Sequence, residues 1–319
     1  MAAQRARAFA ATSAARVVAL YSRSVERAKS LCAETGAQPY DDYEAMLQGV
    51  EAVVLCLPNH LHASFARKAL EAGKHVLVEY PLCLSAEEAA SLARAAERTD
   101  RVLMVGNTII RERMFTYVTE RLSRLGGLVS AASRVAFYDA AVAGAWYMDP
   151  EKSGSCFAAY SYHHIEYFRR LLGEVTWVLA KDESRPDPAR PGCLSLTGGT
   201  LVMGHQGGAT SCIQWYLSAA GQGLARGFWL TGSEGTLCIV SASGTEDAST
   251  ALWNGGGGEN TERFANEWGV GASCEDFLEA IAGRLDHRAR LASDMTTLRV
   301  GLAAARSALS GRSESLQGK

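Results

Sequence analysis

One stretch of the sequence, residues 53–81, constrains the fold more than any other. It contains two short apolar runs, Val53–Leu57 and His75–Val78, and between them apolar residues at helical spacing that end at Gly73. Short β-branched runs of this kind are typical of buried parallel strands, and glycine is common just after a helix. The stretch therefore predicts a β–α–β unit.

Polar residues and prolines gather directly after both predicted strands. The first group is Leu57, Pro58, Asn59 and His62, and the second is Glu79, Tyr80 and Pro81. In open α/β sheets, ligands bind just beyond the carboxyl ends of the strands. We therefore expect these two groups to border a ligand site, although His62 has an alternative role as a cap of its own helix.

The first third of the chain continues the alternation of strands and helices. A strand is predicted over residues 16–21, a helix from Ser24 to Glu34, another helix over 85–98 and a further strand over 102–105. This spacing favours a parallel, doubly wound sheet of the Rossmann type. We assign residues 1–107 to this domain.

The pattern changes from residue 108 onward. Strand-like stretches now follow one another with glycine-containing turns and few long helices between them: 128–137, 175–182, 200–205, 211–218, 227–232 and 236–241. A mostly antiparallel sheet with helices on one face, as in an α+β domain, is the expected architecture of residues 108–319. The glycine run at 254–258 is predicted to be a surface loop, and residues 310–319 are predicted to be frayed.

The segments at 57–62 and 73–81 resemble the Gfo/Idh/MocA family of NAD(P)-dependent oxidoreductases. Members of that family carry Pro-Asn-x-x-His and then Glu-Lys-Pro, and here Tyr80 replaces the lysine, a variant that is similar to biliverdin reductases. The resemblance covers nearly the whole chain. It implies NADP or NAD as cofactor, a small-molecule substrate, and a second domain for substrate binding and homo-oligomer formation. The cofactor contacts that it implies are Leu57, Pro58, Asn59, His62, Glu79 and Pro81.

The expected start of a dinucleotide-binding domain is not found. Such a domain opens with a strand and a Gly-x-Gly-x-x-Gly turn, where the pyrophosphate meets backbone N–H groups, but no glycine precedes Gly36. Without this central strand the sheet would have two unpaired inner edges. Either the sequence begins too late or the protein has abandoned the nucleotide. Ser22, Arg23 and Ser24 favour the first explanation, since arginine after the second strand suits a ribose 2′-phosphate; its alternative is a solvated turn arginine.

A second motif lies at residues 153–173. It resembles the family segment Gly-Gly-Gly…Asp-x-x-x-His…Leu-x-Gly, with His163 in the place of the catalytic histidine and Ala159 in the place of the aspartate. Two of the three usual catalytic positions, 80 and 159, have therefore changed. Tyr160 lies three or four residues from His163 and His164, so these side chains share one helix face. The alternative is that both histidines are packed, structural residues.

The changed residues favour reduction over alcohol oxidation. Tyrosine, with an ordinary pKa near 10, is a poor base at neutral pH but a competent proton donor. We predict Tyr80 and His163 as catalytic residues acting on a C=N or conjugated C=C bond of a planar or apolar molecule. Predicted substrate contacts are Asn107, Arg111, Tyr160, His164 and Trp146, each with packing or a solvated surface as its alternative. Cofactor-independent catalysis (a cyclase, isomerase or lyase) and non-catalytic ligand binding stay open as other functions.

Composition excludes several other classes of protein. The formal net charge is −2 and the basic residues are scattered, so neither nucleic acid nor an anionic membrane is an expected partner. No apolar run approaches the roughly 18–20 residues that span a bilayer. The eight cysteines lie far apart with no Cys-x-x-Cys, so we predict a cytoplasmic protein with neither disulfides nor a metal site.

Overall fold

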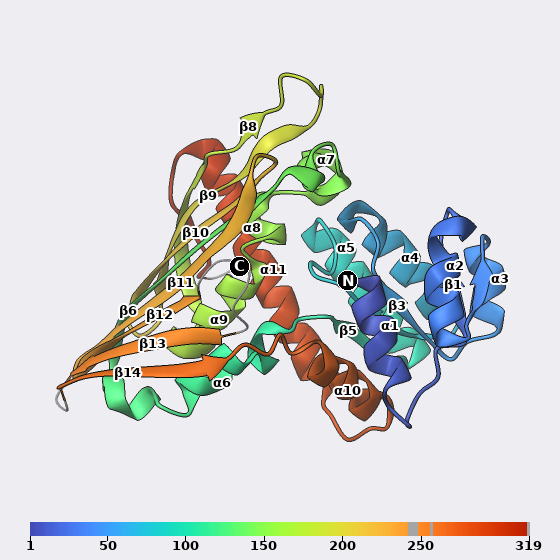
Figure 1. Cartoon of the computed structure of the whole chain (residues 1–319), viewed down its shortest axis with the longest axis horizontal. Helices are drawn as coiled ribbons and strands as arrows, with labels where there is room; N and C mark the ends of the chain where they lie inside the picture. Colours follow the sequence, from blue (N-terminus) through green and yellow to red (C-terminus); the bar gives the residue numbers. More distant parts are fainter. Residues whose placement is uncertain (242–247, 256–257, 318–319) are drawn as a thin grey trace. The chain divides into compact units, whose positions relative to one another are not determined.

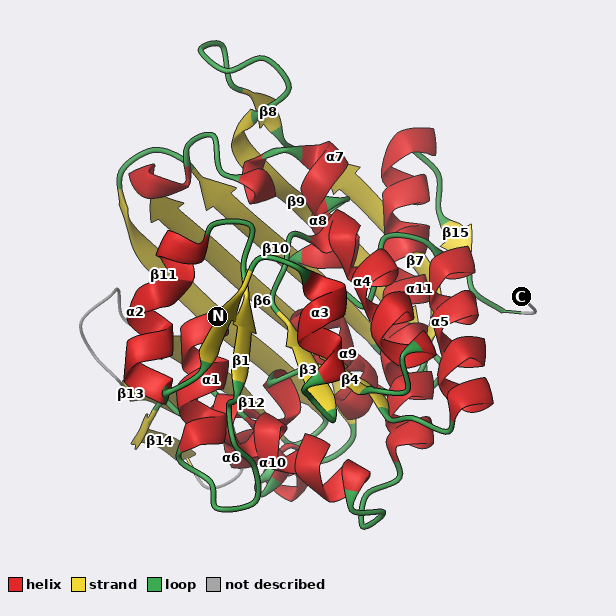
Figure 2. Cartoon of the chain, turned by 90° about the vertical axis from the view of Figure 1, so that its right-hand side faces the viewer, coloured by secondary structure: helices red, strands yellow, loops and turns green. Residues whose placement is uncertain are grey.

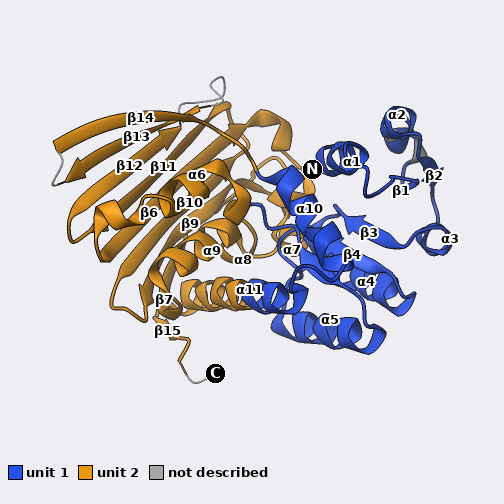
Figure 3. Cartoon of the chain, turned by 90° about the horizontal axis from the view of Figure 1, so that it is seen from below, with its two compact units in different colours: residues 1–108, 269–295 blue, residues 109–268, 296–319 orange. Residues whose placement is uncertain are grey.

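The computed structural model describes residues 1–241, 248–255 and 258–317. The chain forms two compact units (Figure 3): unit 1 comprises residues 1–108 and 269–295, and unit 2 comprises residues 109–268 and 296–319. The division near residue 108 agrees with the sequence analysis. Residues 269–295, which we had assigned to the second domain, instead lie in unit 1.

Unit 1 is an α/β unit in which every strand pairing is parallel. Its elements in chain order are α1 (Ala2–Ala10), β1 (Ala19–Tyr21), α2 (Val25–Thr35), β2 (Gln38–Tyr40), α3 (Tyr43–Gln48), β3 (Ala52–Leu55), α4 (Asn59–Glu71), β4 (His75–Val78), α5 (Ala86–Thr99), β5 (Leu103–Val105) and α10 (Val270–Ile281). The sequence analysis missed β2, which is three residues long and contains Pro39. The predicted Rossmann-type architecture is confirmed.

The parallel sheet of unit 1 is divided into two parts. Strand β1 pairs with β2, while β3, β4 and β5 form a separate sheet. Among the described residues no pairing joins β1 to β3, so each has one edge without a partner, as the sequence analysis expected. Aromatic contacts link the two parts instead: the ring of Phe65 on α4 lies 5.8 Å from Tyr21 of β1 and 4.7 Å from Tyr43 of α3.

The helices α1 and α10 explain why residues 269–295 belong to unit 1. Phe9 of α1 and Phe277 of α10 meet edge to face, with ring centroids 6.4 Å apart. Both rings are buried in a cluster that includes Leu77 of β4 and Met104 of β5. The amphipathic faces of the two helices are thus buried by one core, although they lie near opposite ends of the chain.

Unit 2 contains a ten-stranded sheet with helices against one face (Figures 1 and 2). Its strand order is β14-β13-β12-β11-β6-β10-β9-β7-β15, with β8 paired to β9. The strands are β6 (Leu128–Asp139), β7 (Val175–Asp182), β8 (Arg185–Pro186), β9 (Leu194–His205), β10 (Thr210–Ser218), β11 (Gln222–Gly232), β12 (Gly235–Ser241), β13 (Ala248–Gly255), β14 (Gly258–Ala265) and β15 (Glu314–Ser315). Neighbours run antiparallel except β6 and β10, which are parallel.

Two features of the sheet differ from the sequence analysis. Asn254 and Gly255 end β13 and Gly258 begins β14, so the predicted surface loop at 254–258 is wrong at both ends, and its centre lies outside the described residues. Asn254, Gly255 and Gly258 belong to strands because β13 and β14 pair with each other. Near the chain end, Glu314 and Ser315 pair with β7, where we had expected a frayed segment.

Unit 2 also has helical elements, and several of them share one buried core with the strands. The helical elements are η1 (Ile109–Arg111), α6 (Arg113–Thr119), η2 (Leu122–Leu125), η3 (Ala140–Val142), η4 (Trp146–Met148), α7 (Pro150–Ser153), α8 (Cys156–Ala159), α9 (Tyr162–Leu172) and the second half of α11 (His287–Ser310). Helix α11 approaches α8 so closely that a side chain at Gly301 would meet the Cα atom of Ala158 at 2.6 Å. Only glycine fits there.

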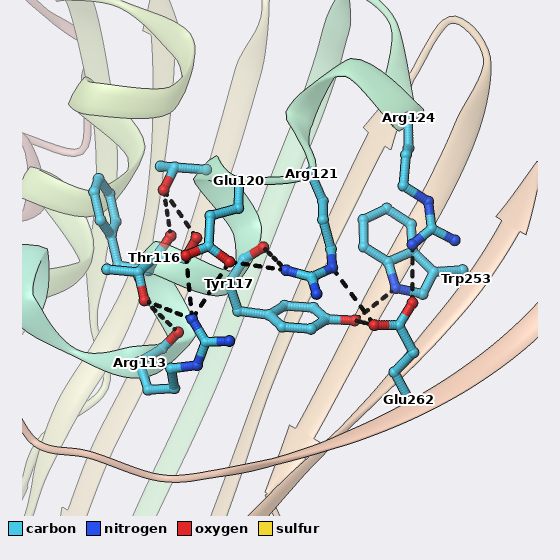
Figure 4. Close-up of polar contacts among 10 residues, drawn as sticks. Arg113, Thr116, Tyr117, Glu120, Arg121, Arg124, Trp253 and Glu262 are labelled. Atoms are coloured by element: carbon cyan, nitrogen blue, oxygen red, sulfur yellow. Dashed lines mark hydrogen bonds and ion pairs between the residues drawn. The ribbon is translucent and has the colours of Figure 1, made fainter.

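Polar and cationic contacts attach α6 to the edge of the sheet (Figure 4). The Glu262 carboxylate of β14 accepts hydrogen bonds from the Tyr117 hydroxyl at 2.8 Å and from Arg124 Nη1 at 2.9 Å. The guanidinium of Arg124 lies 4.0 Å from the ring centre of Trp253, and that of Arg121 lies 4.1 Å from the ring centre of Tyr117. These contacts hold the outermost hairpin, β13–β14, against α6.

The other face of the sheet carries an exposed apolar row. The strand register places seven residues side by side across seven neighbouring strands. They are Leu179, Val202, Cys212, Ala132, Trp229, Cys238 and Leu252. Trp229 is 41% exposed and Leu252 is 44% exposed. We call this set the apolar row.

Candidate active site

The predicted site residues of unit 1 gather at one edge of the sheet. Strands β3, β4 and β5 are parallel, so the residues that follow them emerge at the same edge. Leu57, Pro58 and Asn59 follow β3, Glu79, Tyr80 and Pro81 follow β4, and Asn107 follows β5. The structure therefore brings these seven predicted residues together, and the Tyr80–Pro81 peptide bond is cis.

A buried ion pair fixes Glu79 at this edge. Arg5 of α1 donates from Nε to Glu79 Oε1 at 2.7 Å, and the two side chains are only 1% and 10% exposed. Arg5 also donates to the Gly106 carbonyl at 2.9 Å and to the Ser273 hydroxyl at 3.0 Å. A Cβ atom at Gly106 would lie 2.5 Å from the guanidinium, so glycine makes room for it. Burial raises the pKa of Glu79, and the charge of Arg5 opposes that rise.

The sequence analysis missed Arg5. A signal for it exists in the sequence, because Arg5 and Phe9 are four residues apart and hence share one helix face. An arginine on the same face as a buried phenylalanine needs a carboxylate or carbonyl partner inside the protein.

His62 lies between the two strand-end segments and contacts both. Its side chain is fully buried in the first turn of α4, with Nδ1 2.7 Å from the Pro81 carbonyl oxygen and Nε2 2.9 Å from the Leu57 carbonyl oxygen. Both ring nitrogens are thus engaged by the protein backbone. His62 therefore supports the two strand-end segments through their backbone carbonyls, and its contact with the cofactor stays a prediction.

The remaining predicted residues of unit 1 are placed as follows. Asn107 is 6% exposed and donates from Nδ2 to Asp294 Oδ1 at 3.3 Å. Ser22, Arg23 and Ser24 follow β1, and the Ser24 backbone N–H donates to the Ser22 hydroxyl at 3.2 Å. Arg23 is exposed. Ser24 precedes α2 but makes no side-chain capping hydrogen bond.

In unit 2 the predicted residues stand on the helix side of the sheet. Tyr160 stacks on Trp215 of β10, with ring centroids 4.6 Å apart and an interplanar angle of 10°. Its hydroxyl donates to the Tyr147 carbonyl at 2.5 Å. His163 is half-buried, and its ring lies 6.2 Å from that of Tyr162. Ala159, at the position of the family aspartate, is 1% exposed within α8.

His164 lies deeper than its neighbour. Its Nδ1 is 3.0 Å from the Ser133 hydroxyl, and its ring stacks on Phe228 at 5.1 Å with an angle of 4°. Burial, together with the charge of Arg226, lowers the pKa of His164 well below its ordinary value. A histidine in these surroundings is neutral and structural, which supports the packing alternative over a substrate contact.

Trp146 and Arg111 are the other two predicted substrate contacts. The Trp146 ring meets that of Tyr147 at 5.2 Å in an edge-to-face arrangement, and Arg111 is exposed at the end of η1. Next to Arg111 lies a buried ion pair that the sequence analysis missed. Arg226 of β11 donates to Glu112 Oε2 at 2.7 Å, with side chains 10% and 7% exposed.

The described residues hold no group of three or more histidine, cysteine, aspartate or glutamate side chains arranged for a metal ion. None of the described helices is long and apolar enough to cross a membrane. All eight cysteines carry free thiols. A cavity of about 150 Å³ lies between α5 and the first turns of α11, lined by Arg101, His287 and Met295 among others, and none of the predicted site residues borders it.

Comparison with protein families identifies the chain. Residues 1–107 match the oxidoreductase family with an NAD-binding Rossmann fold, and residues 121–238 match the GFO/IDH/MocA C-terminal domain. The protein belongs to the Gfo/Idh/MocA family of oxidoreductases. This result confirms the resemblance inferred from residues 57–62 and 73–81.

Curated relatives match this family member over part of its length. The D-xylose 1-dehydrogenase (NADP(+)) 2 of Haloferax volcanii is 31% identical over 206 residues, which cover 61% of this chain and 60% of that protein. The dTDP-3,4-didehydro-2,6-dideoxy-alpha-D-glucose 3-reductase of Streptomyces violaceoruber is 36% identical over 115 residues, 35% of this chain and 34% of the relative. The matches thus span about a third to three fifths of these relatives.

Solved structures of the family share the fold. Biliverdin reductase from Synechocystis, in complex with biliverdin and NADP⁺, superposes with a TM-score of 0.84 at 20% identity, covering 95% of this chain and 94% of that one. A 3-ketoreductase from Actinomadura kijaniata, in complex with NADP and TDP-benzene, also gives 0.84, at 21% identity and 95% and 93% coverage. At this level of identity the likeness concerns the fold.

Proposed function

We propose that this family member is an NAD(P)H-dependent reductase of a C=N or conjugated C=C bond in a planar or apolar small molecule. The observation that carries the proposal is the partly buried aromatic cluster on the helix side of the sheet in unit 2. Tyr160 is stacked on Trp215, and Phe137 packs against the same indole at 5.9 Å. The register places Leu217 and Leu224 on either side of Phe137, and all three are half-buried. Flat apolar rings favour a planar ligand over a polyhydroxylated sugar.

Proton transfer is assigned to Tyr80 and His163. Tyr80 replaces the family lysine at the carboxyl end of β4, and Ala159 provides no carboxylate to raise the basicity of His163. A phenol donates a proton to a developing anion more readily than it removes one from an alcohol at neutral pH. Tyr80 would donate to, or hold, the anion that forms on the substrate, and His163 would supply or relay the proton.

Unit 1 has residues that suit some parts of a nicotinamide dinucleotide and lacks residues for another part. The strand-end groups after β3 and β4 suit the nicotinamide and its ribose, and exposed Arg23 after β1 suits a 2′-phosphate, which favours NADP over NAD. No glycine occurs before Gly36 to form a pyrophosphate cradle. When bound, the reduced cofactor supplies a hydride. The chain itself orients the ligand and moves the proton.

The divided sheet of unit 1 favours a second candidate function. Among the described residues no strand lies between β1 and β3, and a strand there is part of the usual framework of a nucleotide site. A cofactor-independent cyclase, isomerase or lyase, or a non-catalytic ligand-binding protein, would need no such framework. A change in NADPH fluorescence on mixing with the protein would distinguish the reductase from both alternatives. Turnover of a candidate substrate without nucleotide would then distinguish the cofactor-independent enzyme from the non-catalytic ligand-binding protein.

We also propose that the protein forms a homo-oligomer through the apolar row. Exposed Trp229 and Leu252 lie in a continuous lateral line across the sheet, and polar residues such as Thr200 and Gln214 flank it. A second copy, turned by a two-fold axis, would cover one row with the other.

Site-directed variants test the assignment of proton transfer. Tyr80→Phe keeps the ring and removes the hydroxyl, so the fold should survive while turnover falls by about 10²–10⁴-fold, the range typical of general acid catalysis. His163→Ala should have an effect of similar size. Tyr80→Lys combined with Ala159→Asp, which restores the family residues, should not improve the native reaction. Near-full turnover of both Tyr80→Phe and His163→Ala would show that these residues only pack.

A further inference from the structure

His62 makes two contacts that a neutral imidazole cannot both satisfy as hydrogen bonds. Its Nδ1 lies 2.7 Å from the Pro81 carbonyl oxygen and its Nε2 lies 2.9 Å from the Leu57 carbonyl oxygen. A carbonyl oxygen only accepts hydrogen bonds, and a neutral imidazole has one N–H group. In the neutral ring, the nitrogen without a proton would therefore point its lone pair at a carbonyl lone pair, which is repulsive.

Two other histidines show how neutral rings are accommodated in this protein. His75 Nδ1 accepts a hydrogen bond from the Val102 backbone N–H at 3.0 Å, so that nitrogen must carry no proton. His205 lies 2.7 Å from the Gly173 carbonyl and 2.8 Å from the Ser211 hydroxyl, which donates or accepts as needed. Both arrangements suit one proton on the ring. Among these three histidines, His62 alone faces two carbonyls.

The surroundings of His62 oppose its protonation. The side chain is fully buried, and burial lowers its pKa while the two carbonyl contacts oppose that fall. The titratable group that acts on the ring is His60 on its own helix, and Glu79, paired with Arg5, stands two residues before Pro81 in the chain. No carboxylate contacts the ring among the described residues. Protonation of His62 therefore depends on the two carbonyl oxygens staying in place.

The two carbonyls belong to the segments that carry predicted site residues. Leu57 precedes Pro58 and Asn59 at the end of β3, and Pro81 follows Tyr80 at the end of β4. We propose that His62 is a positioning residue: as an imidazolium it joins these two segments, and as a neutral ring it holds only one of them. The position of Tyr80 would then change with the protonation state of His62. Its relevance to catalysis rests on the proposed function of Tyr80.

Nuclear magnetic resonance of the whole protein, labelled with ¹⁵N-histidine and selectively labelled tyrosine, tests this proposal. The seven histidines are followed from about pH 4.5 to 7.5, a range that spans the ordinary histidine pKa of about 6.5. We expect His62 to carry protons on both ring nitrogens at the acidic end and to lose one as the pH rises. The Tyr80 ring signal should shift with the same midpoint.

Matched variants make the result specific. His62→Asn, whose amide donates to one of the two carbonyls, should remove the pH-dependent shift of the Tyr80 signal, and His75→Asn should leave it in place. If His62→Asn does not fold, the titration of the unaltered protein still decides the proposal. The proposal would be overturned if the His62 ring carried a single proton throughout the pH range. It would also be overturned if the Tyr80 signal did not change as His62 titrates. Because no turnover is measured, these outcomes are independent of whether Tyr80→Phe retains activity.

Discussion

Unit 1 holds its strand-end residues with buried polar contacts, whereas unit 2, which has buried ion pairs of its own, holds Tyr160 and His164 with stacked rings on a continuous sheet. In unit 1 the parallel sheet is divided between β1 and β3, and Arg5 and His62 bind the segments that follow β4. In unit 2 each strand from β14 to β15 in the sheet order pairs with the next one. Tyr160 stacks on Trp215, and His164 stacks on Phe228.

The difference matters because the loss of an ion-pair partner and the truncation of a stacked ring have different consequences for stability. A buried ion pair that loses one partner leaves an uncompensated charge in the core, and the damage is large. A stacked ring that is shortened loses packing area, but the sheet beneath it stays paired. Residues held by a buried ion pair, such as Glu79, should accordingly be more sensitive to single substitutions outside the site than residues held by stacking, such as Tyr160.

The largest expected effect comes from Arg5→Met. Removing the guanidinium strands the Glu79 carboxylate in a buried position and should lower the free energy of unfolding by ~3–5 kcal/mol. Denaturant titration with hydrogen exchange at β4 and β5 measures the effect and locates it in unit 1. The double variant Arg5→Met/Glu79→Gln should recover part of the loss. A stability near that of the unaltered protein would mean that the pair contributes little.

Completing the divided sheet should strengthen nucleotide binding. A β-strand followed by a Gly-x-Gly-x-x-Gly turn, fused to the N-terminal end of α1, would pair with the free edges of β1 and β3 and offer backbone N–H groups to the pyrophosphate. We expect NADPH to bind about ten- to a hundredfold more tightly than to the unextended chain, the equivalent of one or two charge-assisted hydrogen bonds. Fluorescence titration measures the dissociation constant.

A control uses the same added strand with alanines in place of the turn glycines. This version should complete the sheet without the cradle and bind NADPH no better than the unextended chain. Equal affinity of all three proteins would favour the cofactor-independent function.

Self-association through the apolar row predicts a smaller effect. Trp229→Ser should weaken association by about tenfold or more, because an aromatic residue near the centre of an interface commonly contributes over 1 kcal/mol. Sedimentation at micromolar concentration measures it. Leu309→Ser is the matched control, since Leu309 is 90% exposed on α11 and lies outside the row. A strictly monomeric protein would remove this proposal.

The smallest effect is expected at the edge of unit 2. The hydrogen bonds from Arg124 and Tyr117 lower the pKa of Glu262 in the folded protein, so its contribution to stability is present above the unfolded pKa and is lost as the pH falls through the folded one. Glu262→Gln should lower the free energy of unfolding by about 1 kcal/mol near pH 7, and the difference should shrink below about pH 4. Exposed Glu259→Gln on the same strand should change little at either pH.

Local patterns in the sequence determined much of the fold. The β3–α4–β4 unit was predictable because Val53–Leu57 and His75–Val78 are apolar runs bounded by proline and glycine, and such signals act over a few residues. The mostly antiparallel sheet of unit 2 was predictable for the same reason. The unpaired edges of β1 and β3 among the described residues were predictable because no strand is predicted ahead of residues 16–21.

Contacts between residues far apart in the chain were decided by the tertiary structure alone. The return of residues 269–295 to unit 1 depends on Phe9 meeting Phe277, and the pairing of β13 with β14 depends on a neighbouring strand as a partner. Arg5 bonds to Glu79 across 74 residues, and His62 reaches Pro81 across 19. No local pattern records such partners, because burial and hydrogen bonding become definite only once the segments have packed together.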